Sequence, residues 1–137
     1  MNHRVVHKRL KEIDENLEIL EELKGTPLDE FIRDAKIHKL AERCFQLCLE
    51  CVIDIAQYLI AENQWEQPAS SREAILALGA HEVIPELFAD EISGMAGFRN
   101  ILVHGYISID RAIVYQSLDK LDDLRDFRKN HANTTTR

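Results

Sequence analysis

The stretch from Pro27 to about Asn63 constrains the fold more than any other part of the sequence, because nothing within it ends a helix. Thr26 can cap the start of a helix, and Pro27 suits a first helical turn. Apolar residues then recur at the spacing of one helix face. They are Phe31, Ala41, Phe45, Cys48, Val52, Ile55 and Leu59. A continuous helix of about 35 residues is roughly 50 Å long and has to pack against more than one neighbour.

Three other segments repeat this helical pattern, and a fourth carries a capping signal. The three segments run from Asn2 to Lys24, from about Val83 to Val103 and from Asp110 to about Lys129. Ser70 and Glu73 form a capping box that opens a short helix to about Leu78. No segment alternates apolar and polar residues with the period of two that marks a strand. The sequence therefore predicts an all-α fold of four main helices and one short helix in an up-down bundle.

Composition agrees with a single globular domain over residues 1–130. Hydrophobic residues make up 45% of the 137-residue chain and charged residues 30%, which is ordinary for a globular protein. Residues 131–137 form a polar tail that we expect to be disordered. No apolar run approaches the roughly 20 residues of a membrane span, and the first residues lack the apolar segment of a signal peptide. We therefore expect a cytoplasmic protein without membrane contact.

Charge limits the partners of such a domain. The formal net charge is −7, which disfavours a simple non-specific nucleic-acid binder because such domains are usually basic. A local basic patch could still hold RNA. Four cations fall within an arc of about 120° on the predicted long helix, namely Arg33, Lys36, Lys39 and Arg43. This arc is either a stripe that follows RNA phosphates or an ordinary solvated face.

The segment from Gly97 to Tyr106 concentrates the polar chemistry beside a predicted helix end. Arg99 offers a permanent positive charge and a fork of donors that suits phosphate. His104 is a side chain whose usual pKa suits proton transfer near neutral pH. Gly105 lets the chain leave the helix directly after this histidine, and Asn100 and Tyr106 add polar groups nearby.

Helix geometry separates the two strongest candidates. At about 100° per residue, Tyr106 lies within roughly 20° of Arg99, whereas His104 lies about 140° away from it. Either the helix ends before His104 and the chain turns this residue back, or the site joins residues from two chains. A purely structural interpretation is also open, in which Arg99 pairs with a carboxylate and His104 stabilises the helix C-terminus as a cation.

Arg99, His104 and Tyr106 together match the Arg-x4-His-x-Tyr signature, and the chain therefore resembles the HepT toxins, a branch of the HEPN superfamily. The surrounding sequence Met95–Tyr106 (MAGFRNILVHGY) is similar to that family, as is Ala41–Ala56 (AERCFQLCLECVIDIA) in the predicted long helix. The resemblance extends from about Val5 to Phe127, and all three signature positions are present.

The resemblance implies a helical bundle that forms a homodimer, with the signature facing a cleft between protomers. Family members act as metal-independent endoribonucleases in toxin–antitoxin pairs. It also implies a partner antitoxin, the minimal nucleotidyltransferase MntA. The antitoxin silences the toxin by moving AMP from ATP onto the signature tyrosine, here Tyr106. The toxin itself is then expected to need no cofactor.

A mechanism for these residues follows from their chemistry. His104 would act as general base on a ribose 2′-hydroxyl or as general acid on the leaving oxygen. Arg99 would bind the scissile phosphate and stabilise the charge of the transition state, and Asn100 would position phosphate or His104. AMP on Tyr106 would add bulk and negative charge that exclude RNA. Two alternatives remain open: a non-catalytic adaptor that binds the nucleotidyltransferase, and a nucleotide-binding HEPN module.

Two further clusters lie on the predicted long helix. Glu50 and Asp54 are four residues apart on one face, and we favour a role in orienting Arg99 or His104 over acid–base catalysis or metal binding, since two carboxylates make a poor metal site. Three cysteines fall within about 60° of arc, namely Cys44, Cys48 and Cys51. No histidine stands at zinc spacing, so we expect buried hydrophobic cysteines and no disulfide framework.

The remaining polar and small residues give weaker expectations. The other histidines, His3, His7, His38, His81 and His131, show no common pattern and are expected at the surface. Trp65 is expected to pack on the end of the bundle. A run of small residues, Ser93, Gly94, Ala96 and Gly97, allows either a close approach of two backbones or a kink.

Overall fold

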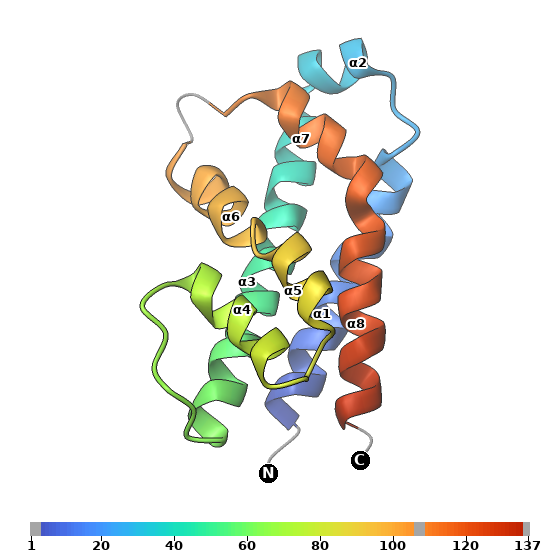
Figure 1. Cartoon of the computed structure of the whole chain (residues 1–137). Helices are drawn as coiled ribbons and strands as arrows, with labels where there is room; N and C mark the ends of the chain where they lie inside the picture. The colour runs from blue at the N-terminus through green and yellow to red at the C-terminus, as the bar shows by residue number, and fades with distance from the viewer. Residues whose placement is uncertain (1–3, 106–108, 136–137) are drawn as a thin grey trace.

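The computed structural model describes residues 4–105 and 109–135, and every regular element within these ranges is a helix, as predicted. The two longest helices, α1 (Arg4–Leu23) and α3 (Ala35–Glu62), run antiparallel along each other at the centre of the bundle (Figure 1). The Cys48 sulfur lies 3.8 Å from the carbonyl oxygen of Ile13. A small side chain on α3 thus allows α1 to approach closely.

α3 is the core helix of this bundle. Its most apolar window has a mean hydropathy of 1.5, so its length and composition alone would allow it to cross a membrane. In the bundle, 61% of that window is buried against other parts of the chain. The apolar residues of α3 are therefore used for packing between helices.

The prediction of one helix from Pro27 to Asn63 is wrong at Asp34. The backbone of Asp34 is extended, with φ −92° and ψ 105°, and separates α2 (Leu28–Arg33) from α3. The Asp34 carboxylate accepts a hydrogen bond of 2.9 Å from the backbone N–H of Lys36 and so caps the start of α3. Aspartate competes with helical hydrogen bonding in this way because its side chain is short.

Contacts with α7 (Arg111–Ser117) hold α2 in its separate orientation. The Tyr115 hydroxyl donates a hydrogen bond of 2.7 Å to the carbonyl of Thr26. The aromatic rings of Tyr115 and the buried Phe31 pack in a T-shaped arrangement, with their centroids 5.1 Å apart. These contacts join residues far apart in the sequence. They stabilise the break in a way that local sequence signals could not predict.

The predicted helix from Val83 to Val103 is also two helices, α5 (Glu86–Ile92) and α6 (Met95–His104). Ser93 and Gly94 join them in a tight bend. The Ser93 hydroxyl donates a hydrogen bond of 2.8 Å to the carbonyl of Asp90. The small residues therefore lie at a bend. A Cβ added at Gly94 or Gly97 would meet nothing within 4 Å, so neither glycine is needed for close packing within the chain.

The C-terminal segment begins at its predicted cap, because the Asp110 carboxylate accepts 2.9 Å from the N–H of Ala112. It then passes through α7, a 3-10 turn (Leu118–Lys120) and α8 (Leu121–Thr135). α8 continues to Thr135 and so includes residues 131–135 of the predicted polar tail. Neither glycine nor proline occurs in this stretch to end the helix earlier.

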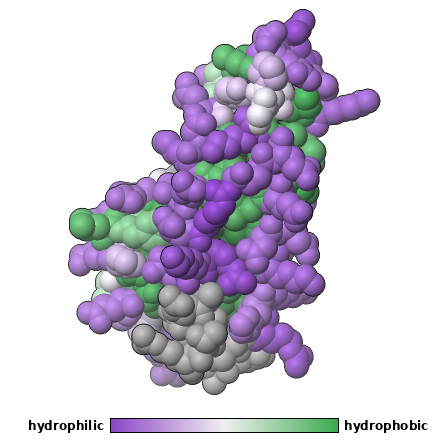
Figure 2. Space-filling model, turned by 90° about the vertical axis from the view of Figure 1, so that its right-hand side faces the viewer, coloured by the Kyte–Doolittle hydropathy of each residue, from purple (hydrophilic) through white to green (hydrophobic). Residues whose placement is uncertain are grey.

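Ion pairs join α8 to α1. Arg128 Nε lies 3.1 Å from Asp14 Oδ2, and Arg125 pairs with Glu21. Figure 2 looks at this side of the molecule and shows a mostly hydrophilic surface, with hydrophobic residues in the middle of the face and at its edges. This face is therefore an ordinary solvated surface.

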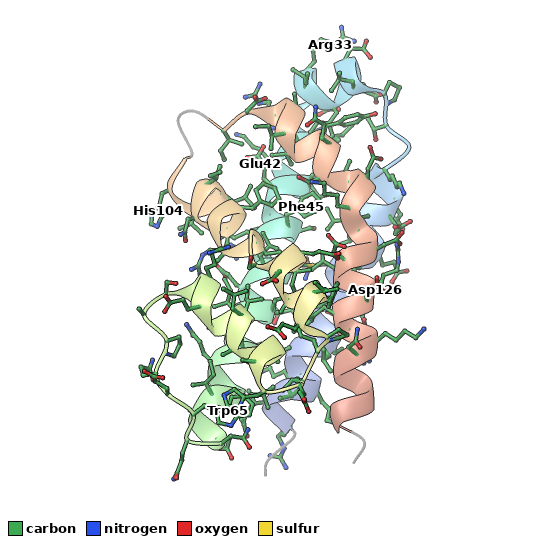
Figure 3. The ribbon with its side chains drawn as sticks, viewed as in Figure 1. Arg33, Glu42, Phe45, Trp65, His104 and Asp126 are labelled. Carbon is green, nitrogen blue, oxygen red and sulfur yellow. The ribbon has the colours of Figure 1, made fainter. Side chains whose placement is uncertain are left out.

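The short helix α4 (Ser71–Ala80) starts at its predicted capping box, since the Ser70 hydroxyl accepts 3.1 Å from the N–H of Glu73. The Trp65 ring stacks on His81 with centroids 3.8 Å apart and an interplanar angle of 4°. Trp65 thus packs at the end of the bundle, as expected, and ties the loop before α4 to the residue that follows it (Figure 3).

α4 meets α5 at a position where only glycine fits. A Cβ at Gly79 would lie 2.7 Å from the Ala89 Cβ and 3.1 Å from the Glu86 Cα. We expect Gly79→Ala to lower the free energy of unfolding by about 1–3 kcal/mol through overpacking. Gly97→Ala is the matched control, and it should not lower the free energy of unfolding, because an added Cβ at Gly97 meets no other atom within 4 Å. Urea denaturation of both variants measures the difference, and equal stabilities would contradict this packing.

Candidate active site

The short helix α6 carries three of the candidate residues, Arg99, Asn100 and His104. His104 is the last helical residue, and it is exposed at the end of α6, pointing away from the bundle (Figure 3). Gly105 follows as the C-cap, and its N–H donates 2.8 Å to the carbonyl of Ile101. A Cβ at Gly105 would lie 2.5 Å from that same oxygen. Glycine is therefore required directly after His104.

α6 remains helical through His104, so the alternative in which the helix ends before this residue is wrong. Arg99 and His104 consequently project about 140° apart around the helix axis. Within one copy of the chain, they do not face a common point. Tyr106 lies outside the described residues, and its predicted role is not tested by the structure.

Arg99 is half-buried and held by two neutral oxygen atoms. Its Nε donates a hydrogen bond of 3.0 Å to Asn100 Oδ1. Its Nη2 donates a hydrogen bond of 3.3 Å to the hydroxyl of Ser71, which is the first residue of α4. Among the described residues Arg99 forms no ion pair with a carboxylate. The part of the structural interpretation that pairs Arg99 with a carboxylate is therefore wrong for the described residues, whereas His104 does lie in the last turn of α6, where a cation is favoured.

Neither Glu50 nor Asp54 forms an ion pair with this arginine among the described residues. Glu50 accepts 3.1 Å from Gln46 Nε2, and Asp54 Oδ2 lies 3.3 Å from Arg9 Nε. Burial raises the pKa of Asp54 above its usual value, the charge of Glu50 raises it further, and Arg9 and Arg99 oppose this shift. Asp54 and Arg99 thus interact electrostatically without forming an ion pair.

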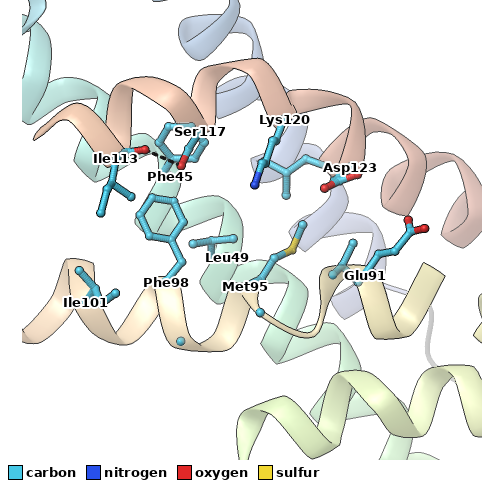
Figure 4. Close-up of a pocket in the computed structure, with 14 residues that line it drawn as sticks. Phe45, Leu49, Glu91, Met95, Phe98, Ile101, Ile113, Ser117, Lys120 and Asp123 are labelled. Carbon is cyan, nitrogen blue, oxygen red and sulfur yellow. Dashed lines mark hydrogen bonds between the residues drawn. The ribbon is translucent and has the colours of Figure 1, made fainter. Parts of the chain in front are cut away.

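An apolar hollow of about 560 Å³ adjoins His104 on the side of α7. Its wall combines Asn100, His104 and Gly105 with apolar side chains. Three of these apolar residues, Phe98, Ile101 and Ile113, also line a second cavity between α6 and the helices α7 and α8 (Figure 4). Ile101 is 52% exposed and Ile113 is 50% exposed. The surface beside His104 therefore has an uncovered apolar component.

The predicted basic arc is interrupted by the break at Asp34. Arg33 belongs to α2 and its Nη2 lies 3.3 Å from Asp29 Oδ2, so its placement on the long helix was wrong. Lys36, Lys39 and Arg43 lie on α3 at helical spacing, and all three are exposed. A shorter basic stripe therefore remains on the core helix.

The three cysteines are buried, as predicted. Burial raises the pKa of Cys44 and Cys48 and raises the pKa of Cys51 to about 12. These thiols consequently stay protonated and pack as small hydrophobic groups. In residues 4–105 and 109–135, no group of three or more His, Cys, Asp or Glu residues could hold a metal ion.

Sequence reasoning also misplaced His38 and missed the contact that Ser71 makes with Arg99. His38, expected at the surface, is 3% exposed, and its Nδ1 lies 3.2 Å from Glu42 Oε2, one helical turn further along α3. Ser71 gave no signal as a partner of Arg99, because the contact depends on how α4 packs beside α6. His7 and His81 are exposed as expected, while the side chains of His3 and His131 lie outside the described part.

Comparison with known proteins gives a consistent result. The chain is 26% identical over 114 residues to the tRNA nuclease HepT of Aphanizomenon flos-aquae, covering 83% of this chain and 78% of that protein. It is 34% identical over 83 residues to the mRNA nuclease HepT of Shewanella oneidensis, covering 60% of this chain and 62% of that protein. These relatives are nucleases with different named RNA targets.

A solved structure supports the same relationship. The tri-AMPylated Shewanella oneidensis HEPN toxin, in complex with MNT antitoxin, matches with a TM-score of 0.83 and 26% identity, covering 95% of this chain and 97% of that chain. A family model described as "Ribonuclease HepT-like" matches residues 13–130, which include α6 and its polar residues. This match spans most of the sequence, and the chain belongs to the HepT-like ribonuclease family.

Proposed function

We propose that this protein is a metal-independent endoribonuclease toxin whose site is completed in the cleft of a homodimer. The observation that carries the proposal is the geometry of α6. Arg99 and His104 project in different directions from one regular helix, so their convergence on one phosphate requires a second protomer. The apolar residues Ile101 and Ile113 beside His104 supply a surface that a second copy can cover.

In the proposed reaction, His104 takes the proton of a ribose 2′-hydroxyl while that oxygen attacks the adjacent phosphorus, or it gives a proton to the leaving 5′-oxygen. Arg99 binds the scissile phosphate and stabilises its developing charge. The partner protomer's copy of the signature can provide the second acid or base. No metal is needed in this scheme, and Lys36, Lys39 and Arg43 are available to hold further RNA phosphates.

Control of the activity is proposed to pass through Tyr106. A nucleotidyltransferase antitoxin of the MNT type, cytoplasmic like the toxin, would transfer AMP from ATP to the tyrosine hydroxyl and release pyrophosphate. The added phosphate brings negative charge to a site built for RNA phosphates, and the nucleoside brings bulk. The tri-AMPylated state of the Shewanella oneidensis toxin supports this proposal. The names of the two relatives make tRNA and mRNA the first substrates to test.

The direct test is RNA cleavage in EDTA by wild-type protein and by His104→Ala, after intact mass has shown that neither carries AMP. We expect wild-type cleavage and a loss of at least about 100-fold in the variant, because general acid–base catalysis contributes roughly that much. Equal cleavage by both proteins would reject His104 as the catalytic group. Absence of cleavage in both, with tRNA and mRNA supplied, would favour the adaptor that only binds the nucleotidyltransferase.

A further inference from the structure

Arg99 lies between two helices, and its hydrogen bonds divide the guanidinium group into two edges. Nε and Nη2 form one edge, and this edge donates to Asn100 Oδ1 at 3.0 Å and to the Ser71 hydroxyl at 3.3 Å. A guanidinium group has five N–H donors, so about three remain. These are both hydrogens of Nη1 and the second hydrogen of Nη2. The Nη2 hydrogen and the Nη1 hydrogen beside it form a fork that can bind a phosphate in a bidentate manner.

The Ser71 hydroxyl is not required to begin α4. Ser70 provides the cap by accepting 3.1 Å from the N–H of Glu73, and the Glu73 carboxylate accepts 2.9 Å from the N–H of Ala69. Ser70 caps α4 and Glu73 bonds to the residue before this cap, and neither bond involves the Ser71 hydroxyl. Ser71 is half-buried between α4 and α6, and its hydroxyl accepts a hydrogen bond from Arg99.

The neutrality of these acceptors matters for an anionic substrate. A carboxylate in the place of Ser71 would neutralise Arg99 and compete with phosphate for its donors. Ser71 and Asn100 instead fix the orientation of the guanidinium and leave its positive charge in place. Asp54 is the carboxylate that acts on Arg99 through charge, and its own ion pair is with Arg9.

We propose that Ser71 is a positioning residue that turns the free Nη1–Nη2 edge of Arg99 toward the scissile phosphate. This proposal rests on the ribonuclease function proposed above. Loss of the hydroxyl would let the guanidinium rotate about its long side chain, and a correctly oriented group is worth more in the transition state than in the bound ground state. The effect should therefore appear mainly in kcat.

The test compares two neighbouring serines, of which Ser70 caps α4 and Ser71 accepts a hydrogen bond from Arg99. Ser71→Ala is expected to lower kcat for RNA cleavage by roughly 5- to 10-fold with little change in KM or melting temperature. Ser70→Ala is expected to lower the melting temperature, because the helix cap is lost, while kcat measured well below that temperature stays near the wild-type value. Ser71→Thr keeps a hydroxyl and should recover most of kcat.

Two outcomes would overturn the proposal. One is a Ser71→Ala enzyme with wild-type kcat, and the other is an equal loss of kcat in both alanine variants, which would mean that fraying of α4 is sufficient. The contact is also tested without activity by the NMR resonance of the Arg99 Nη2–H group that donates to Ser71, assigned by its absence in Arg99→Lys. This resonance should shift in Ser71→Ala and not in Ser70→Ala.

The two proposals fail in different ways. If wild-type protein does not cleave RNA, the ribonuclease proposal fails, and an unshifted Arg99 resonance in Ser71→Ala would reject the positioning role independently. If wild-type protein cleaves RNA and Arg99→Ala does not, a fully active Ser71→Ala rejects the positioning role alone.

Discussion

Arg99→Ala is expected to lower RNA cleavage by about 100- to 1000-fold, the usual effect of removing a donor that stabilises transition-state charge. The fold should persist, because the hydrogen bonds of the Arg99 guanidinium go to two neutral oxygens and it forms no ion pair among the described residues. The cost in stability should stay below about 1 kcal/mol, since the lost contacts lie near the surface. Single-turnover cleavage and thermal melting of the same preparation measure both effects.

Arg128→Ala is the matched control for this experiment. It removes the same charge from α8, where Arg128 Nε pairs with Asp14 of α1 at 3.1 Å. In Figure 1, α6 lies at the left of the bundle and the C-terminal half of α8 lies at the lower right. We expect the control to cleave RNA at the wild-type rate. An Arg99→Ala protein that is unfolded, or one that cleaves like the control, would show that Arg99 has a structural role instead.

Tyr106→Phe is expected to abolish AMP addition and leave a toxin that the antitoxin cannot silence by modification. The reason is chemical, because the phenolic oxygen is the atom that would attack the α-phosphorus of ATP and the variant lacks it. Cells that express both proteins should stop growing with the variant and continue with the wild type. Intact mass of the purified toxin should show AMP on the wild type and none on the variant.

Tyr115→Phe provides the control, since the Tyr115 hydroxyl is engaged in a 2.7 Å hydrogen bond to the Thr26 carbonyl. Its removal affects the anchoring of α2 and should leave AMP addition intact. If cells survive with Tyr106→Phe and the antitoxin, silencing works by binding alone. A mass increase on Tyr106→Phe would place the modification on another side chain.

The sequence predicted the helical class and several helix starts correctly, because these depend on local chemistry. Ser70 and Asp110 cap helices where the sequence places them. The break at Asp34 was missed because aspartate can lie within a helix or before one, and the choice is made by the docking of α2 on Tyr115. The bend at Ser93 was one of two alternatives that the sequence left open, since small residues permit a bend without requiring it.

The candidate site was predictable from the sequence only as far as its residues lie on one segment. Arg99, Asn100 and His104 follow each other on α6, and the requirement for glycine after His104 is met at Gly105. Ser71 is 28 positions away from Arg99 in the sequence, and its contact depends on tertiary packing. His38 was placed wrongly because a histidine can be buried when a carboxylate lies within reach, here Glu42 one turn away.

The burial of Cys44, Cys48 and Cys51 makes the natural chain a suitable background for chemical labelling. Thiol reagents attack the thiolate, and the raised pKa of each buried thiol keeps that form scarce near neutral pH. A cysteine introduced on the exposed face of α3, for example by Lys39→Cys, is then the reactive one in the native state. Spin labels attached there would report the separation between two copies of the chain without removal of any natural cysteine.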